Sequence, residues 1–145
     1  MISTPCGDTA VTDPPARALV DTSVFIATES GRRVDLDVLP KAWTASVVTF
    51  AELTAGVLAA RDTTTRSRRL ATVARLQNLE LLPVTEAVAG HWARLRLLVA
   101  EQRRRVNVND LWIAATAASH GLPLLTQDAD FDVLAEVGGI EVIRV

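Results

Sequence analysis

The sequence predicts an α/β fold in which helices cover both faces of a mostly parallel sheet. Short apolar segments alternate with longer segments of helical periodicity along most of the chain. The short segments are apolar throughout rather than alternating, which is typical of strands buried on both faces. With 145 residues, of which 49% are hydrophobic and 22% charged, the chain is long enough for one domain with a proper core.

The first elements follow a tail. Residues 1–16 hold prolines and a glycine among small polar residues, so we expect a flexible tail there and a single domain over 17–145. The apolar segment 17–21 predicts a buried strand. Residues 22–29 then predict a short helix, which Gly31 ends.

The middle of the chain predicts two further strands and three helices. A weak strand over 42–46 precedes a helix over 47–60, which begins next to a serine and a threonine suited to capping. A helix over about 64–77 has apolar residues at every third position. A strand over 79–82 ends at a proline, and a threonine cap opens a long helix over about 85–103.

The last third predicts two helices and two strands. The first helix is expected to begin at Asn109 or Asp110 and to end at the glycine before a strand over 122–126. A short helix over 131–136 and a final strand over 140–145 complete the expected pattern.

Composition excludes several classes of protein. Cys6 is the single cysteine, so an internal disulfide and a cysteine-based zinc site are excluded. No apolar run approaches the roughly 18 residues that a membrane helix needs, and the first residues do not resemble a secretory signal. We therefore expect a cytoplasmic protein without a membrane segment.

The charge is unevenly distributed along the chain. Residues 61–105 carry ten arginines against four acids, whereas the formal net charge of the whole chain is −2. This cationic block indicates either a polyanionic partner or two solvated helix faces. Its first part comprises Arg61, Arg66, Arg68, Arg69 and Arg75.

Four acids lie at positions that are not typical of solvated surface acids, namely at the ends of apolar strands or beside apolar residues of helices. Asp21 ends the first predicted strand, and Asp128 follows the strand over 122–126. Ligands of open parallel sheets bind beyond the carboxyl ends of the strands. Glu52 and Asp110 lie on predicted helices beside apolar or small side chains. Buried carboxylates are unfavourable unless a charge compensates them, which suggests a shared divalent cation.

Oxygen ligands favour Mg²⁺ or Mn²⁺ over zinc and suit phosphodiester hydrolysis. Each acid also has a structural interpretation, which the sequence leaves open. Asp110 is then a helix cap, Asp21 is a turn residue, and Glu52 pairs with an arginine.

Four motifs in this order resemble those of PIN-domain nucleases and, more narrowly, of the VapC toxins of bacterial toxin–antitoxin pairs. They are Val20-Asp21-Thr22-Ser23, Ala51-Glu52-Leu53, Asn109-Asp110-Leu111-Trp112-Ile113-Ala114-Ala115-Thr116-Ala117 and Thr126-Gln127-Asp128-Ala129-Asp130-Phe131. The resemblance spans about residues 18–145. It implies a three-layer α/β/α sandwich and a Mg²⁺- or Mn²⁺-dependent endoribonuclease.

The resemblance also implies a role for each acid. Asp21, Glu52, Asp110 and Asp128 would form the catalytic site, with Asp21 and Asp110 as the direct metal ligands. Glu52 would orient water or act as a base, and Asp128 would hold a second ion or a water. Asp130 is a spare acid that either begins the next helix or substitutes for Asp128.

Further implications concern hydroxyl groups and partners. Thr126 and Ser23 match positions whose hydroxyl groups support the acids by hydrogen bonds. Proteins of this family form homodimers and bind a VapB-type antitoxin whose tail occupies the acidic groove. RNA is the implied substrate.

Two matters stay open at this point. Arg103, Arg104 and Arg105 either contact RNA phosphates or form a solvated helix end. The alternative function is a non-catalytic module whose acidic groove binds a basic peptide. A haloacid-dehalogenase-like phosphatase is disfavoured because Ser23 stands where its second aspartate belongs, and a receiver domain because the single lysine, Lys41, lies too early.

Overall fold

The computed structural model describes residues 14–145, with the side chain of residue 36 excepted. Its five strands are β1 (Arg17–Val20), β2 (Ala42–Ser46), β3 (Glu80–Leu82), β4 (Leu124–Thr126) and β5 (Val142–Arg144). They form one sheet in the order β3-β2-β1-β4-β5, and every neighbouring pair is parallel. The predicted parallel sheet is confirmed.

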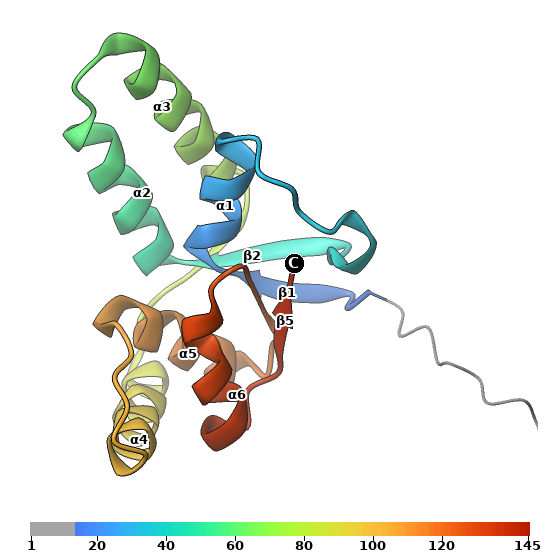
Figure 1. Cartoon of the computed structure of the whole chain (residues 1–145), viewed down its shortest axis with the longest axis vertical. Coiled ribbons are helices and arrows are strands. Elements are labelled where there is room, and N and C mark those ends of the chain that lie inside the picture. The colour runs from blue at the N-terminus through green and yellow to red at the C-terminus, as the bar shows by residue number, and fades with distance from the viewer. Residues whose placement is uncertain (1–13) are drawn as a thin grey trace, which may run out of the picture.

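Six α-helices connect the strands (Figure 1). They are α1 (Thr22–Glu29), α2 (Val47–Ala59), α3 (Thr63–Gln77), α4 (Glu86–Glu101), α5 (Val108–His120) and α6 (Asp132–Gly138). Short 3-10 turns at Leu36–Val38 and Ala129–Phe131 were not expected from the sequence. None of the helices within residues 14–145 combines the length and apolarity needed to cross a membrane.

The helices form two layers on opposite faces of the sheet, as the three-layer expectation requires. Helices α1, α2 and α3 pack on one face and α4, α5 and α6 on the other (Figure 1). Successive strand residues point to opposite faces. Accordingly, Leu19 belongs to the core beneath α4–α6 and Val20 to the core beneath α1–α3. This two-sided burial explains why the strands are apolar throughout.

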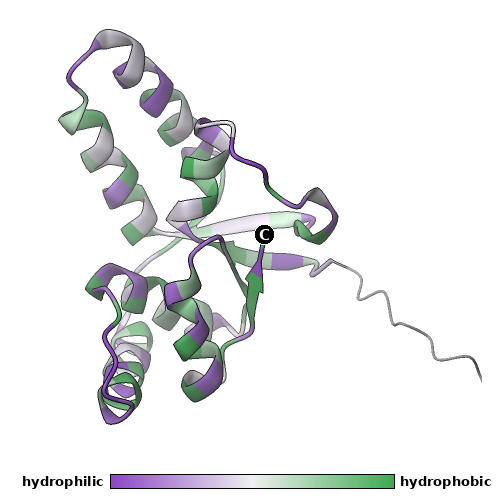
Figure 2. Cartoon of the chain, in the orientation of Figure 1, coloured by the Kyte–Doolittle hydropathy of each residue, from purple (hydrophilic) through white to green (hydrophobic). Residues whose placement is uncertain are grey.

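Hydropathy along the helices agrees with this arrangement. Figure 2 shows hydrophobic and hydrophilic residues interleaved along the helices, as expected for helices with one buried side. The buried residues of α4, for example, are Val88, Leu95 and Val99.

Most predicted helix ends are confirmed. Ser46 caps α2, Thr85 caps α4, and Gly121 ends α5 in the left-handed conformation with a φ of 60°. The predicted start of α5 at Asn109 or Asp110 is wrong. Asn107 caps that helix, because its side chain accepts a hydrogen bond of 2.8 Å from Asn109 N. Asp110 therefore lies in the first turn and is not the capping residue.

Residues 1–13 of the expected tail lie outside the described part of the chain. At its end, the backbone oxygens of Pro15 and Ala16 accept hydrogen bonds from Lys41 N and Ala42 N. These two residues therefore lie beside the start of β2.

Candidate active site

The candidate site lies at the carboxyl ends of β1 and β4, which are neighbours in the sheet. Asp21 follows β1, and its backbone N donates to Leu125 O at 2.8 Å. Asp128 follows β4 by two residues. From β1 the chain adds β2 and β3 on one side of the sheet and then β4 and β5 on the other, so the strand order reverses between β1 and β4. Open α/β folds bind ligands at the carboxyl ends of the strands at such a point.

Asp21 is buried and held by hydroxyl groups. It retains 3% of its accessible surface and accepts hydrogen bonds at Oδ2 from Thr126 Oγ1 (2.9 Å) and Ser23 N (3.3 Å). These bonds favour the ionised carboxylate, whereas burial opposes it. The pKa of Asp21 is raised because burial outweighs the hydrogen bonds.

The supporting hydroxyl groups form an ordered chain. Gln127 N donates to Ser23 Oγ at 3.0 Å, and Ser23 Oγ lies 3.2 Å from Thr126 Oγ1. Each hydroxyl has one proton, and that of Thr126 points to Asp21. Ser23 must therefore donate to Thr126. Thr126 Oγ1 also accepts from Asp128 N at 2.9 Å, so one hydroxyl links the positions of Asp21 and Asp128.

Glu52 reaches the site from α2. Thr22 Oγ1 donates to Glu52 Oε1 at 2.8 Å and lies 3.0 Å from the hydroxyl of Thr49. Thr22 and Thr49 are both buried. Neither threonine was predicted to be a site residue. The available signals were that Thr22 follows Asp21 directly and that Thr49 lies one helical turn before Glu52.

Three aspartates form the tightest group of acids. Carboxylate oxygens of Asp110, Asp128 and Asp130 all lie within 4.8 Å of one another. Asp110 and Asp128 are half-buried and Asp130 is exposed. Asp128 Oδ1 accepts from Asp130 N at 2.9 Å, which holds the two acids of this loop together. Asp130, treated as a spare acid in the sequence, is thus a member of the group.

The electrostatics of Asp110 connect all five acids. Burial, followed by the charges of Asp21, Asp128, Glu52 and Asp130, raises the pKa of Asp110 from 3.8 to about 7. Like charges at short range disfavour each other's ionised form, and a bound cation would remove that repulsion.

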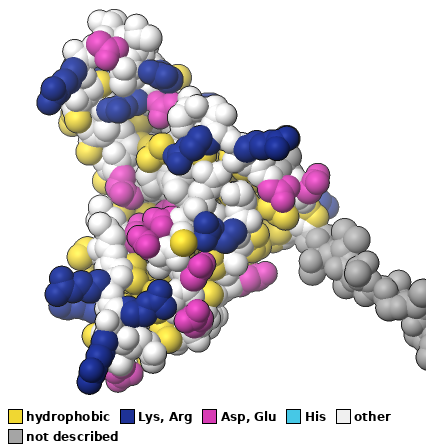
Figure 3. Space-filling model, in the orientation of Figure 1, with side chains coloured by type: hydrophobic (Ala, Val, Ile, Leu, Met, Phe, Trp, Pro, Cys, Tyr) yellow, Lys and Arg dark blue, Asp and Glu magenta, His cyan; other side chains and the backbone are white. Residues whose placement is uncertain are grey.

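Arginine does not neutralise these acids in the described part of the chain. The side-chain ion pairs within residues 14–145 are Arg17–Glu80, Arg104–Glu136 and Arg144–Asp132. The alternative in which Glu52 pairs with an arginine is therefore wrong for residues 14–145. Figure 3 shows acidic side chains near the middle of one face, with basic side chains to either side.

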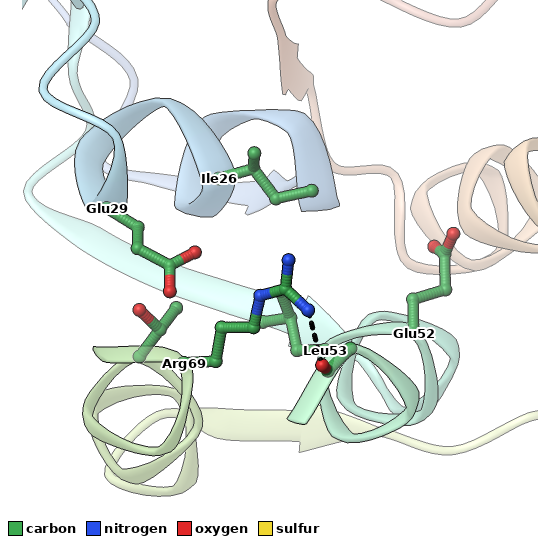
Figure 4. A pocket seen from close by; sticks show the side chains of 7 residues that line it. Ile26, Glu29, Glu52, Leu53 and Arg69 are labelled. Carbon is green, nitrogen blue, oxygen red and sulfur yellow. Dashed lines mark hydrogen bonds between the residues drawn. The ribbon is translucent and has the colours of Figure 1, made fainter. Parts of the chain in front are cut away.

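A pocket of about 210 Å³ adjoins Glu52 between α1, α2 and α3. Figure 4 shows Glu52 at one end of it, Glu29 at the other and the Arg69 side chain between them. Arg69 NH1 donates to Gly56 O at 2.6 Å, and Arg66 NH2 donates to Ala60 O at 2.9 Å. These two arginines of the cationic block therefore fasten α3 to α2, which is a structural role.

The three arginines at 103–105 are exposed and follow the end of α4. Arg104 lies 3.8 Å from Glu136, while Arg103 has a φ of 53°, which is left-handed. Arg104 and Arg105 border an apolar groove of about 440 Å³ that also includes Trp92. Trp92 stacks on Trp112 at 4.9 Å between ring centres, which links α4 to α5.

Comparison with known proteins places the chain in a family. The family model described as "PIN domain" matches residues 18–137. Ribonuclease VapC5 of Mycobacterium tuberculosis is 53% identical over 131 residues, covering 90% of this chain and 97% of that protein. Ribonuclease VapC4 of the same organism is 44% identical over 121 residues, covering 83% and 93%.

A solved structure agrees with these matches. The crystal structure of VapBC-5, a member of the VapBC family of toxin-antitoxin systems from Mycobacterium tuberculosis, superposes with a TM-score of 0.84. The sequence identity is 50%, and the match covers 90% of this chain and 100% of that chain. Because the matched regions include the whole sheet edge that carries the acids, the chain belongs to the PIN-domain family.

Proposed function

We propose that this chain is a Mg²⁺- or Mn²⁺-dependent endoribonuclease and the toxin of a toxin–antitoxin pair, with residues 17–145 as its single catalytic domain. The observation that carries this proposal is the group of carboxylates at one sheet edge. Burial, together with the charges of the neighbouring acids, raises the pKa of Asp110 there to about 7. The ribonuclease names of the relatives support the choice of RNA as substrate.

The donor set fits a hard divalent cation. Carboxylate oxygens are the ligands that Mg²⁺ and Mn²⁺ prefer, and three of them gather within 4.8 Å. Asp21, Asp110 and Asp128 are the proposed ligands. We add Asp130, because the three carboxylates that gather are those of Asp110, Asp128 and Asp130, a group that does not include Asp21. When bound, the ion supplies activation of a water and stabilisation of charge on the phosphate.

The chain's own residues then have distinct proposed roles. Thr126, supported by Ser23, holds the Asp21 carboxylate in one orientation. Glu52 accepts a hydrogen bond from Thr22 through Oε1. Its other oxygen is available to orient the attacking water or to take its proton, which is the part of a general base.

The proposed partners follow from the relatives. VapBC-5 is a toxin–antitoxin system, which supports a VapB-type antitoxin with a basic tail as the partner of the acidic groove. A homodimer is part of the same proposal. Cellular RNA as substrate would place the activity in the cytoplasm.

The test is cleavage of structured RNA by the purified chain with Mg²⁺ or Mn²⁺, with and without a chelator. We expect cleavage to require the metal and to fall by at least about 100-fold in Asp21→Asn and Asp110→Asn. Glu141→Gln is the matched control, because Glu141 is an exposed acid outside the group. Undiminished cleavage in both asparagine variants would refute the proposal.

The alternative function, a non-catalytic binding module, predicts a different result in this cleavage experiment. Tight binding of a basic peptide to the acidic site, with no turnover of transfer, ribosomal or messenger RNA under either metal, would favour that alternative.

A further inference from the structure

Gln127 stands between two site residues, Thr126 and Asp128, and connects three parts of the molecule. Its backbone N donates to Ser23 Oγ at 3.0 Å. Its side-chain Nε2 donates to Arg33 O at 2.9 Å, and its backbone O accepts from Arg144 NH2 at 3.0 Å. Two arginines from opposite ends of the domain are thereby held next to the residue that precedes Asp128.

The segment that carries Arg33 is held against the end of α1 by a backbone hydrogen bond. After α1 the chain turns at Gly31, whose φ of 72° is left-handed, and Arg32 N donates to Ala27 O at 2.9 Å. Gln127 binds the backbone carbonyl of Arg33, so the Arg33 guanidinium takes no part in this hydrogen bond. Arg33 is also exposed. Arg33 also forms no ion pair in the described residues.

The second arginine is placed by the sheet. Arg144 on β5 is the register partner of Thr126 on β4. Its side chain is 47% exposed and lies 3.7 Å from Asp132, a weak exposed ion pair that a phosphate can replace. β5 is the outer strand on this side of the sheet, so Arg144 lies on the side of β4 away from Asp21.

We propose that Arg33 and Arg144 form a phosphate-binding rim that holds the RNA backbone beside the acidic site, with Gln127 as the residue that binds the backbone of Arg33 and the side chain of Arg144. The proposal rests on the proposed ribonuclease function and names further substrate-binding residues for it. A polyanion that approaches five carboxylates needs positive charge beyond that of a bound metal ion. Phosphate contacts from arginine supply such charge and position nucleic acid without reading its sequence.

The rim has a clear boundary. Asp35 and Asp37 follow Arg33 in the same loop, and Asp35 Oδ1 accepts from Asp37 N at 3.1 Å. The loop therefore becomes acidic towards the start of β2, which would repel phosphates. We accordingly place the backbone contacts at Arg33 and Arg144 and not farther along the loop.

The experiment measures binding of a short fluorescein-labelled single-stranded RNA by anisotropy over a series of salt concentrations. Asp110→Asn serves as the background so that the RNA is not cleaved. We expect Arg33→Ala and Arg144→Ala each to weaken binding about threefold to tenfold. Each should also lower the slope of log affinity against log salt by about 0.7, the value for one phosphate contact to a single strand.

Two further variants make the result interpretable. Arg17→Ala is the matched control, because Arg17 also forms an exposed ion pair but lies at the amino end of β1, whereas the acids lie at the carboxyl edge. Arg144→Lys keeps the charge and should retain the salt slope if electrostatics matter. Arg33→Ala leaves the backbone bond to Gln127 intact, so a folding defect does not account for its effect.

Kinetics separate this proposal from the proposed function. In the chain with Asp110 intact, the Arg33→Ala/Arg144→Ala double variant should raise KM with kcat nearly unchanged, which is the sign of lost uniform binding. If the chain cleaves no RNA, the proposed function fails while the binding measurement still tests the rim. RNA affinity of the rim variants within twofold of that of Arg17→Ala would overturn the rim. Lost affinity for a purified protein partner with RNA binding unchanged would also overturn it.

Discussion

The position of Glu52 depends on a single hydroxyl, that of Thr22. The donor–acceptor distance of 2.8 Å and the burial of Thr22 leave the Glu52 carboxylate few alternative orientations. A general base must be held in a productive geometry, and a displacement of about 1 Å can lower a rate about 100-fold.

Thr22→Val removes the hydroxyl but keeps the shape of the side chain. We expect kcat for RNA cleavage to fall about tenfold or more with KM little changed, because substrate binding does not require this hydrogen bond. Thr22→Ser should restore most of the activity, and Thr64→Val, at an exposed threonine of α3, should have no effect. Equal loss in the valine and serine variants would indicate packing instead of positioning.

Asp110 makes the stability of the metal-free protein depend on pH. Its pKa is 3.8 in the unfolded chain and about 7 in the folded chain, owing to burial and to the neighbouring acids. Between these two values the folded state binds the proton and the unfolded state does not. Its contribution is therefore present at low pH, and stability falls as the pH rises towards 7.

Asp110→Asn should therefore flatten this fall, since asparagine does not ionise. In a chelator, the thermal midpoint of the variant should exceed that of the parent chain above the pKa of about 7. Added Mg²⁺ or Mn²⁺ should raise the midpoint of the parent and have a smaller effect on the variant. A variant whose midpoint tracks the parent across the pH range would contradict the assignment of this charge repulsion.

At the scale of elements, the position at which α5 begins decides where Asp110 lies in its first turn. Asn107 begins this helix, and its Oδ1 accepts from Asn109 N at 2.8 Å. Asp110 lies in the first turn, where the positive end of the helix dipole favours an anionic side chain.

Asn107→Ala should lower the free energy of unfolding by about 1 kcal/mol, because an unpaired N–H is left at the helix start. Urea denaturation followed by circular dichroism measures this change. Asn109→Ala is the control and should be neutral or slightly stabilising, since only the backbone of Asn109 is used in the cap. An equal loss in both variants would mean that the cap contributes nothing specific.

At the scale of the whole molecule, the layer of α4, α5 and α6 depends on a close approach of α6 to α4. A Cβ added at Gly138 would lie 2.6 Å from Leu95 Cδ2, and Leu95 is completely buried. Because Leu95 is completely buried and protein cores are close-packed, its side chain must displace neighbouring atoms in order to move.

Gly138→Ala should therefore destabilise the protein by about 1–3 kcal/mol through overpacking. Gly90→Ala is the matched control on α4, because no atom lies within 4 Å of the added Cβ. It should stabilise the chain by up to about 1 kcal/mol, since glycine disfavours a helix interior. Thermal and chemical denaturation of both variants measure the difference, and a neutral Gly138→Ala would show that the two helices can separate.

Much of the fold was predictable because it depends on local patterns. Strands buried on both faces must be apolar throughout, so Leu19 and Val20 identify β1 although they enter different cores. Caps and breakers such as Thr85 and Gly121 act within a few residues and marked the helix ends correctly. The start of α5 was misplaced because three polar residues within four positions, Asn107, Asn109 and Asp110, offered competing caps.

The sequence by itself determined the alternation of elements, the parallel sheet and the two acids at its carboxyl edge, Asp21 and Asp128, because these follow from periodicity and strand direction. Only the tertiary structure decided that Asp130 joins Asp110 and Asp128, that Thr22 holds Glu52, and that Gln127 binds the backbone of Arg33 and the side chain of Arg144. Each of these depends on distances of a few ångströms between elements far apart in the chain, and no local pattern specifies such distances.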